Sequence, residues 1–188
     1  MIKLHLFDID GTVLDSMRMW DELAPSYLKS LGIDPPADIS DTIDPMPVDE
    51  VYSYLADTFD IPGGEPAVRK AAEEYLHYQY ENLVLPFNDA VHELEELHAE
   101  GTRIAGFSNT PHEFFEPALK RHGLDRFFEK IYTVEDTKIR KSSPESFLIV
   151  CDYFGLEPSE IMVHDDSSFA LDAAKAAGCF CKSYDRYR

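Results

Sequence analysis

The chain has 188 residues, of which 44% are hydrophobic, and its 36 acidic residues against 17 basic ones give a formal net charge of −19. This apolar content is enough for one core domain with a sizeable insertion. A surface of this charge repels nucleic acid and anionic membranes, so neither is expected as a partner. No run approaches the roughly 20 apolar residues of a membrane span, and no signal cleavage site is present. A cytoplasmic protein is therefore expected.

The first half of the chain is predicted to contain one strand followed by helices. Residues 2–7 are short and mostly apolar, which indicates a buried strand. The residues after Asp10 do not alternate as the return strand of a hairpin would, because apolar residues over 17–31 recur at mostly helical spacing and Gly32 supplies a stop. Up to Pro86 the sequence continues as amphipathic helical segments separated by loops rich in Pro, and it shows no convincing strand.

The pattern changes after Pro86, where predicted helices and strands alternate. The helices are predicted over 88–101, 111–123, 143–155 and 168–178, and the strands over 102–109, 127–136, 160–166 and 179–184. Strands that alternate with helices imply a parallel sheet covered on both faces. The expected architecture is an α/β domain with an all-helical insertion after its first strand.

Polar residues stand where three of the predicted strands end. They are Asp8 and Asp10, Ser108 and Asn109, and Asp165 and Asp166, with Lys141 just before a predicted helix. In an open parallel sheet, ligands bind outside the carboxyl ends of the strands. Paired carboxylates at one edge repel each other unless a hard cation lies between them, and oxygen ligands suit Mg²⁺. A metal ion with Lys141 can hold a phosphoryl group against the negative field of the chain, while one carboxylate attacks phosphorus.

Four stretches of the sequence, DIDGT, FSN, KSSP and VHDDS, occur in this order along the chain. In order and spacing the chain resembles the haloacid dehalogenase superfamily over nearly its whole length. The resemblance implies a Rossmann-like three-layer α/β/α core with a mostly parallel sheet, formed by residues 1–15 and 87–188. Residues 16–86 are similar to the helical cap inserted after the first motif in the subclass of phosphoglycolate phosphatase and β-phosphoglucomutase.

The resemblance also implies a role for each motif residue. Asp8 would be the nucleophile that forms an aspartyl-phosphate, and Asp10 the general acid that protonates the leaving oxygen and then the base that activates water. Ser108 would hydrogen-bond a phosphoryl oxygen, and Lys141 would neutralise charge in the transition state. The phosphate-binding residues would be Gly11, Thr12, Ser108, Asn109 and Lys141. The Mg²⁺ ligands would be Asp8, Asp10 through its backbone carbonyl, Asp166 and Asp165.

Two of the motifs depart from the pattern of the family. Ser142 replaces the first Pro of the usual Lys-Pro-x-Pro, and Lys138 lies close by, so the choice of Lys141 rests on its spacing from the following helix. The usual Gly-Asp-Ser-x-x-Asp has Asp165 in place of its Gly and Ala170 in place of its second Asp. Asp165 would take over the work of the missing carboxylate, and this departure bears on metal affinity.

An Asp at position 10 favours phosphoryl transfer over dehalogenation, because a halide leaving group needs no proton. The prediction is a Mg²⁺-dependent phosphatase that hydrolyses a small phosphorylated metabolite. Two alternatives stay open: a phosphomutase of the β-phosphoglucomutase type, and a non-catalytic regulatory module that binds a phosphorylated ligand. His112, His164 and Trp20 are expected to be structural. The sequence gives neither the substrate nor the oligomeric state.

Overall fold

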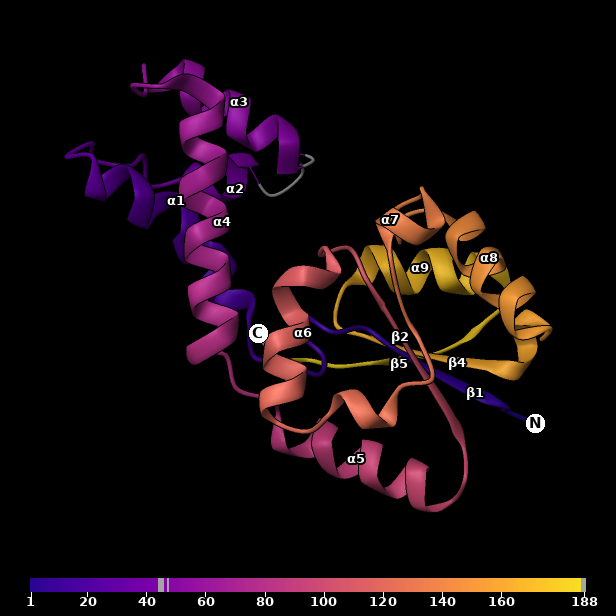
Figure 1. The fold of residues 1–188 in the computed structure, drawn as a ribbon. Helices are drawn as coiled ribbons and strands as arrows, with labels where there is room; N and C mark the ends of the chain where they lie inside the picture. Colours follow the sequence, from indigo (N-terminus) through magenta and orange to yellow (C-terminus); the bar gives the residue numbers. More distant parts are fainter. Residues whose placement is uncertain (44–45, 47, 187–188) are drawn as a thin grey trace. The chain divides into compact units, whose positions relative to one another are not determined.

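The computed structural model describes residues 1–43, 46 and 48–186. The chain divides into two compact units, one formed by Met1–Ser16 with Val84–Arg188 and the other by Met17–Leu83. Figure 1 shows the elements of both units. Within the described part of the chain, every helix is too short or too polar to cross a membrane.

The first unit contains a five-stranded parallel sheet. Its strands are β1 (Leu4–Phe7), β2 (Arg103–Ser108), β3 (Ile131–Thr133), β4 (Ile161–Asp165) and β5 (Phe180–Ser183). They lie in the order β3-β2-β1-β4-β5, so that Leu4 of the central strand pairs with Arg103 on one side and with Ile161 on the other. The strand order reverses at β1, and this is the point at which an open α/β sheet opens a crevice at its carboxyl edge.

Helices cover both faces of this sheet. They are α5 (Asn88–Ala99), α6 (His112–Arg121), α7 (Val134–Thr137), α8 (Pro144–Phe154) and α9 (Ser168–Ala177), with short 3₁₀ turns at Asp125–Phe127 and Pro158–Glu160. Figure 1 shows α5 and α6 on one face and α8 and α9 on the other. Phe107 and Val163 from the sheet pack with Phe147 and Val150 of α8 and Ala174 of α9 in one buried cluster. The predicted α/β fold with a parallel sheet is confirmed.

The strand predicted over residues 127–136 was too long at both ends. Phe127 belongs to a 3₁₀ turn, and the chain enters α7 directly after Thr133. A capping box explains the second difference: the backbone N–H of Thr133 donates to Asp136 Oδ2 at 3.0 Å, and the Thr133 hydroxyl accepts from the N–H of Glu135 at 3.2 Å. These two contacts satisfy free donors at the helix start, and they outweigh the strand preference of Val134.

The second unit consists of helices joined by turns and loops, with no strand among its described residues. Its helices are α1 (Met17–Ser30), α2 (Ile39–Ile43), α3 (Val48–Thr58) and α4 (Gly64–Asn82). It has a core of its own in which Leu28, Tyr52, Leu55 and Val68 are buried. The acidic stretch over 38–50 contains α2 and the start of α3, while residues 44, 45 and 47 lie outside the described part. Whether this unit acts as a cap stays a prediction.

Candidate active site

The carboxyl ends of β1, β2 and β4 bring the predicted site residues together. Asp8 follows β1 directly, and its backbone N–H donates to the carbonyl of His164 in β4 at 2.8 Å. Asp165 ends β4 and Ser108 ends β2. Since β1 lies between β2 and β4, these ends meet at one edge. Carboxylate oxygens of Asp8, Asp165 and Asp166 all lie within 4.8 Å of one another.

Lys141 lies inside this carboxylate cluster. Its side chain is buried, and its Nζ donates to Asp8 Oδ1 and to Asp165 Oδ2, the second contact at 2.8 Å. The backbone N–H of Lys141 donates to Asn109 Oδ1 at 3.1 Å, so Asn109 fixes the loop that carries the lysine. Lys138, the other candidate in sequence, is exposed and follows α7. The structure therefore places Lys141 in the cluster, as its spacing predicted.

The electrostatics of the cluster follow from burial and from its excess of carboxylates. Burial raises the pKa of Asp8 well above its usual value, although Lys141 partly opposes this. Burial and the neighbouring Asp165 raise the pKa of Asp166 to about 6. Burial disfavours the charged form of Lys141, but the carboxylates of Asp165 and Asp8 outweigh it and raise its pKa. The lysine is thus charged, but it is a single cation beside the three carboxyl groups of Asp8, Asp165 and Asp166.

The cluster fits a hard divalent cation. Asp8 Oδ2 is buried and has no hydrogen-bond partner among the described residues, so this oxygen is available as a ligand or a nucleophile. An all-oxygen donor set is the kind that Mg²⁺ prefers. Gly11, at φ +86°, makes room for one member of the set, because a Cβ at this position would lie 2.4 Å from Asp166 Oδ2.

Asp10 is held by two hydroxyl groups. Ser16 Oγ donates to Asp10 Oδ1 at 2.6 Å, and Ser108 Oγ donates to Asp10 Oδ2 at 3.3 Å. Ser108 Oγ also accepts from the backbone N–H of Thr110 at 3.0 Å, so the hydroxyl that was expected to meet a phosphoryl oxygen is oriented toward Asp10 here. Sequence reasoning missed Ser16, whose signal is only its position between the first motif and the first helix.

Two further residues predicted to bind phosphate lie in the turn after Asp10. The backbone N–H of Gly11 donates to the carbonyl of Leu14 at 2.9 Å, which closes the turn. Thr12 is fully buried, and its hydroxyl has no hydrogen-bond partner among the residues that the structure describes. Their predicted part in binding phosphate stays a prediction.

The two histidines and the tryptophan make packing contacts. His164 stacks on Phe7 with ring centroids 3.9 Å apart, and its Nε2 lies 2.8 Å from His5 Nδ1. Burial lowers the pKa of His164 to about 2, so its ring is neutral. The ring of His112 lies 5.0 Å from that of Phe115. Within the second unit, Trp20 Nε1 donates to the hydroxyl of Tyr80 at 3.1 Å.

A parallel α/β sheet with buried carboxylates and a buried lysine at its carboxyl edge is the architecture of an enzyme of the open α/β class. A model of the family described as haloacid dehalogenase-like hydrolase matches residues 5–182, and the chain belongs to this family. The predicted family and the predicted class of enzyme, a hydrolase of this type, are confirmed.

Relatives agree with this assignment, and a solved structure shares the fold. A phosphoglycolate phosphatase of Thiobacillus denitrificans is 30% identical over 190 residues, covering 97% of this chain and 84% of the relative. A phosphorylated carbohydrates phosphatase of Thermotoga maritima is 26% identical over 174 residues, covering 92% and 80%. The crystal structure of a predicted phosphoglycolate phosphatase from Haemophilus somnus has a TM-score of 0.83 at 22% identity, covering 98% of this chain and 86% of that one.

Proposed function

We propose that the protein is a Mg²⁺-dependent phosphatase that hydrolyses a small phosphorylated metabolite through an aspartyl-phosphate intermediate. The observation that carries the proposal is the different environment of the two carboxylate oxygens of Asp8. One of its oxygens is held by Lys141, and the other is buried with no hydrogen-bond partner among the described residues. A carboxylate fixed in this way presents one oxygen for attack. The phosphatases named among the relatives support the choice of reaction.

In the first half of the reaction, Asp8 Oδ2 attacks the phosphorus of the substrate. The P–O bond to the leaving group breaks, and Asp10 donates a proton to the leaving oxygen. The two hydroxyls that bind Asp10, those of Ser16 and Ser108, keep its carboxyl group in place. Lys141, whose Nζ contacts Asp8, stabilises the negative charge that builds up on the transferring phosphoryl oxygens.

In the second half, Asp10 takes a proton from a water molecule whose oxygen attacks the phosphorus of the aspartyl-phosphate. The bond between phosphorus and Asp8 Oδ2 breaks, inorganic phosphate leaves, and the carboxylate of Asp8 is restored. Asp10 thus ends this half-reaction protonated, as the next first step requires. Asp165 orients Lys141 through the 2.8 Å contact between Oδ2 and Nζ.

The Mg²⁺ ion would be held by the carboxylates of Asp8 and Asp166 and by the backbone carbonyl of Asp10, with Asp165 nearby. When bound, it supplies the positive charge that the carboxylate cluster lacks and withdraws electrons from the phosphoryl oxygens. The helical unit Met17–Leu83 would serve as the cap that closes over the substrate and excludes bulk water.

The test is phosphate release from a panel that includes 2-phosphoglycolate and several sugar phosphates, with and without Mg²⁺, for wild type and Asp8→Asn. We expect release that depends on Mg²⁺ and falls at least about 10³-fold in Asp8→Asn, while the circular dichroism spectrum stays unchanged. Turnover retained by Asp8→Asn would contradict the mechanism. Isomerisation of a sugar phosphate without phosphate release would instead indicate the phosphomutase.

A further inference from the structure

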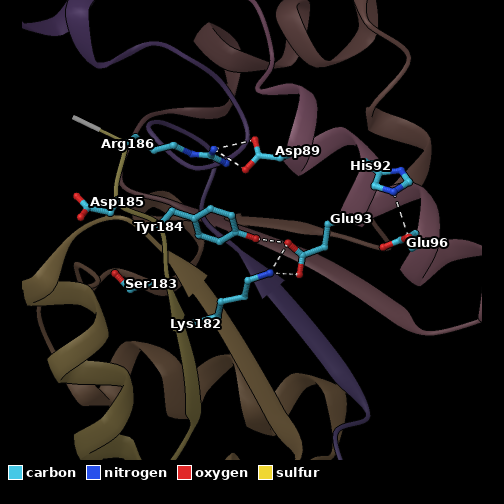
Figure 2. A pocket seen from close by; sticks show the side chains of 9 residues that line it. All are labelled: Asp89, His92, Glu93, Glu96, Lys182, Ser183, Tyr184, Asp185 and Arg186. Carbon is cyan, nitrogen blue, oxygen red and sulfur yellow. Dashed lines mark hydrogen bonds and ion pairs between the residues drawn. The ribbon is translucent and has the colours of Figure 1, made fainter. Parts of the chain in front are cut away.

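The chain that follows β5 places one arginine in an unusually well-defined environment. The Arg186 side chain is only 12% exposed, and its guanidinium carbon lies 4.1 Å from the ring centroid of Phe87 and 4.7 Å from that of Tyr184. Its Nη1 donates to both carboxylate oxygens of Asp89, at 2.7 and 2.6 Å (Figure 2). Two aromatic rings and a carboxylate thus fix the plane and the direction of the guanidinium group.

The fixed guanidinium group also reaches the turn that follows Asp10. Arg186 Nη2 donates to the backbone carbonyl of Thr12 at 3.2 Å. Thr12 lies inside a turn closed by backbone hydrogen bonds from Gly11 to Leu14 and from Leu14 to Ile9. Arg186, 174 residues after Thr12 in sequence, therefore ties the middle of this turn to Asp89 at the start of α5.

The same turn is paired with the segment over residues 85–87, through which the chain returns to the first unit. The N–H of Phe87 donates to the carbonyl of Val13 at 2.9 Å, and the N–H of Asp15 donates to the carbonyl of Leu85 at 2.8 Å. The outgoing and returning segments thus form a short antiparallel pair within the first unit. Arg186 contacts both segments, through the carbonyl of Thr12 and through the ring of Phe87.

We propose that Arg186 is a positioning residue for the reaction, which holds the turn over residues 9–14 so that the carboxyl group of Asp10 faces the leaving oxygen. The inference rests on the proposed function, in which Asp10 carries the proton. Arginine suits this task because its planar group lies against the rings while two separate nitrogens donate to Asp89 and to the carbonyl of Thr12. The compact ammonium of lysine has no such plane.

The expected effect is on the turn more than on the stability of the fold. The Asp89 side chain is 64% exposed, and ion pairs with an exposed partner contribute little to stability. Arg186→Ala should therefore fold, while the carbonyl of Thr12 loses its side-chain donor and the turn opens more often. A small misplacement of a catalytic group is enough to lower a rate by one or two orders of magnitude.

The chain offers a matched control in Arg103. Its guanidinium group also pairs with a carboxylate, with Nε and Nη2 each at 2.9 Å from an oxygen of Glu129, and it lies 4.8 Å from the ring centroid of Phe154. It stands at the start of β2, at the opposite end of the strand from the site. Arg103→Ala therefore removes a comparable ion pair and ring contact without touching the turn.

The experiment compares wild type, Arg186→Ala, Arg186→Lys and Arg103→Ala by two measurements. The first is amide hydrogen exchange of the peptide that spans residues 9–16, in the full chain without substrate. The second is kcat/KM with Mg²⁺ for 2-phosphoglycolate, whose alkoxide leaving group needs a proton, and for p-nitrophenyl phosphate, whose leaving group needs little help. Because kcat/KM reports the steps up to phosphoenzyme formation, the ratio of the two substrates isolates proton donation.

In Arg186→Ala we expect exchange in residues 9–16 to rise about tenfold and kcat/KM for 2-phosphoglycolate to fall at least about tenfold, with a clearly smaller fall for p-nitrophenyl phosphate. Arg186→Lys should recover only part of both effects, and Arg103→Ala should match wild type. If 2-phosphoglycolate is not turned over, another alkyl phosphate from the panel replaces it.

The possible negative results distinguish a failure of the inference on Arg186 from a failure of the proposed function. Unchanged exchange in Arg186→Ala refutes the inference even if the enzyme is an active phosphatase. Raised exchange with an equal fall for both substrates also refutes it, because the arginine would then be merely structural. Wild type that releases phosphate from no ester refutes the proposed function, and the inference falls with it.

Discussion

Gly11→Ala is the substitution for which the structure gives the clearest expectation. Two separate costs arise at this position. The backbone has φ +86°, which L-residues rarely adopt, and a Cβ would lie 2.4 Å from Asp166 Oδ2 and 2.8 Å from its Cγ. The first cost belongs to the backbone alone, and the second belongs to the proposed metal site.

The two costs can be worked out in turn. A non-glycine residue at positive φ costs about 1–2 kcal/mol. Relieving the overlap requires the Asp166 carboxylate to move by roughly 1 Å, because ordinary contacts begin near 3.4 Å. Overpacking of this size costs a further 1–3 kcal/mol or so. We therefore expect Gly11→Ala to lose about 2–5 kcal/mol of unfolding free energy and to bind Mg²⁺ about 10–100-fold more weakly, since a ligand is displaced.

Gly101→Ala separates the two costs. Gly101 has φ +73°, and a Cβ there would meet nothing within 4 Å, so the control carries the backbone cost alone. Urea denaturation without metal gives the stabilities, and a Mg²⁺ titration followed by thermal shift gives the affinities. We expect Gly101→Ala to lose only about 1–2 kcal/mol and to keep its Mg²⁺ affinity. Equal Mg²⁺ affinity in Gly11→Ala and Gly101→Ala would refute the reasoning.

Two further predictions concern buried ionisable groups. Lys141→Met should lower kcat at least about 100-fold, because it removes the cation between two buried carboxylates, whereas the exposed Lys138→Met should match wild type in a phosphate-release assay. Burial lowers the pKa of His5, so the unfolded chain binds a proton below about pH 6.5 that the folded chain excludes, and stability falls on acidification. His5→Gln should reduce this loss of unfolding free energy between pH 7.5 and 5.5 by at most about 1 kcal/mol, because His5 is partly exposed. Urea denaturation of wild type and variant at the two pH values measures it. The same loss of unfolding free energy in both proteins would contradict the prediction.

Much of the site could be predicted because its residues are marked by local sequence. Asp8 and Asp165 stand at the ends of apolar strands, and the alternation of strands and helices implies that these ends share one edge. A different local signal, the spacing from the following helix, chose Lys141 over Lys138, and Lys141 lies in the cluster. The four longer helices of the first unit, α5, α6, α8 and α9, were predicted within a few residues, because each has a regular apolar face and a clear stop, such as Gly178 after α9. The short helix α7 was wrongly predicted as the end of a strand.

The remaining features depend on side-chain contacts between distant parts of the chain. Nothing in the sequence indicates that Ser108 donates to Asp10, 98 residues away, or that Arg186 reaches the carbonyl of Thr12. The short length of β3 had a local signal, the capping box of Thr133 and Asp136, but the strand preference of Val134 favoured a longer strand. The hydrophobic periodicity and the order of the motifs predict the fold and the edge of the sheet that carries the site. The orientation of the side chains within the site depends on packing between distant parts of the chain.

The departure at position 165 has a physical consequence for the way this acidic chain handles phosphate. Because Asp165 contacts the same Nζ as Asp8, Lys141 is shared between two carboxylates, which offsets part of the positive charge it offers a phosphoryl group. The cluster with Lys141 carries one positive charge against the carboxylates of Asp8, Asp165 and Asp166, so an anionic substrate needs a divalent cation there. Asp165→Gly, which restores the usual residue of the family, should therefore free Lys141 for the phosphoryl group. Its activity should persist at lower Mg²⁺ concentration than that of wild type, and a higher Mg²⁺ requirement would show that Asp165 is itself a metal ligand.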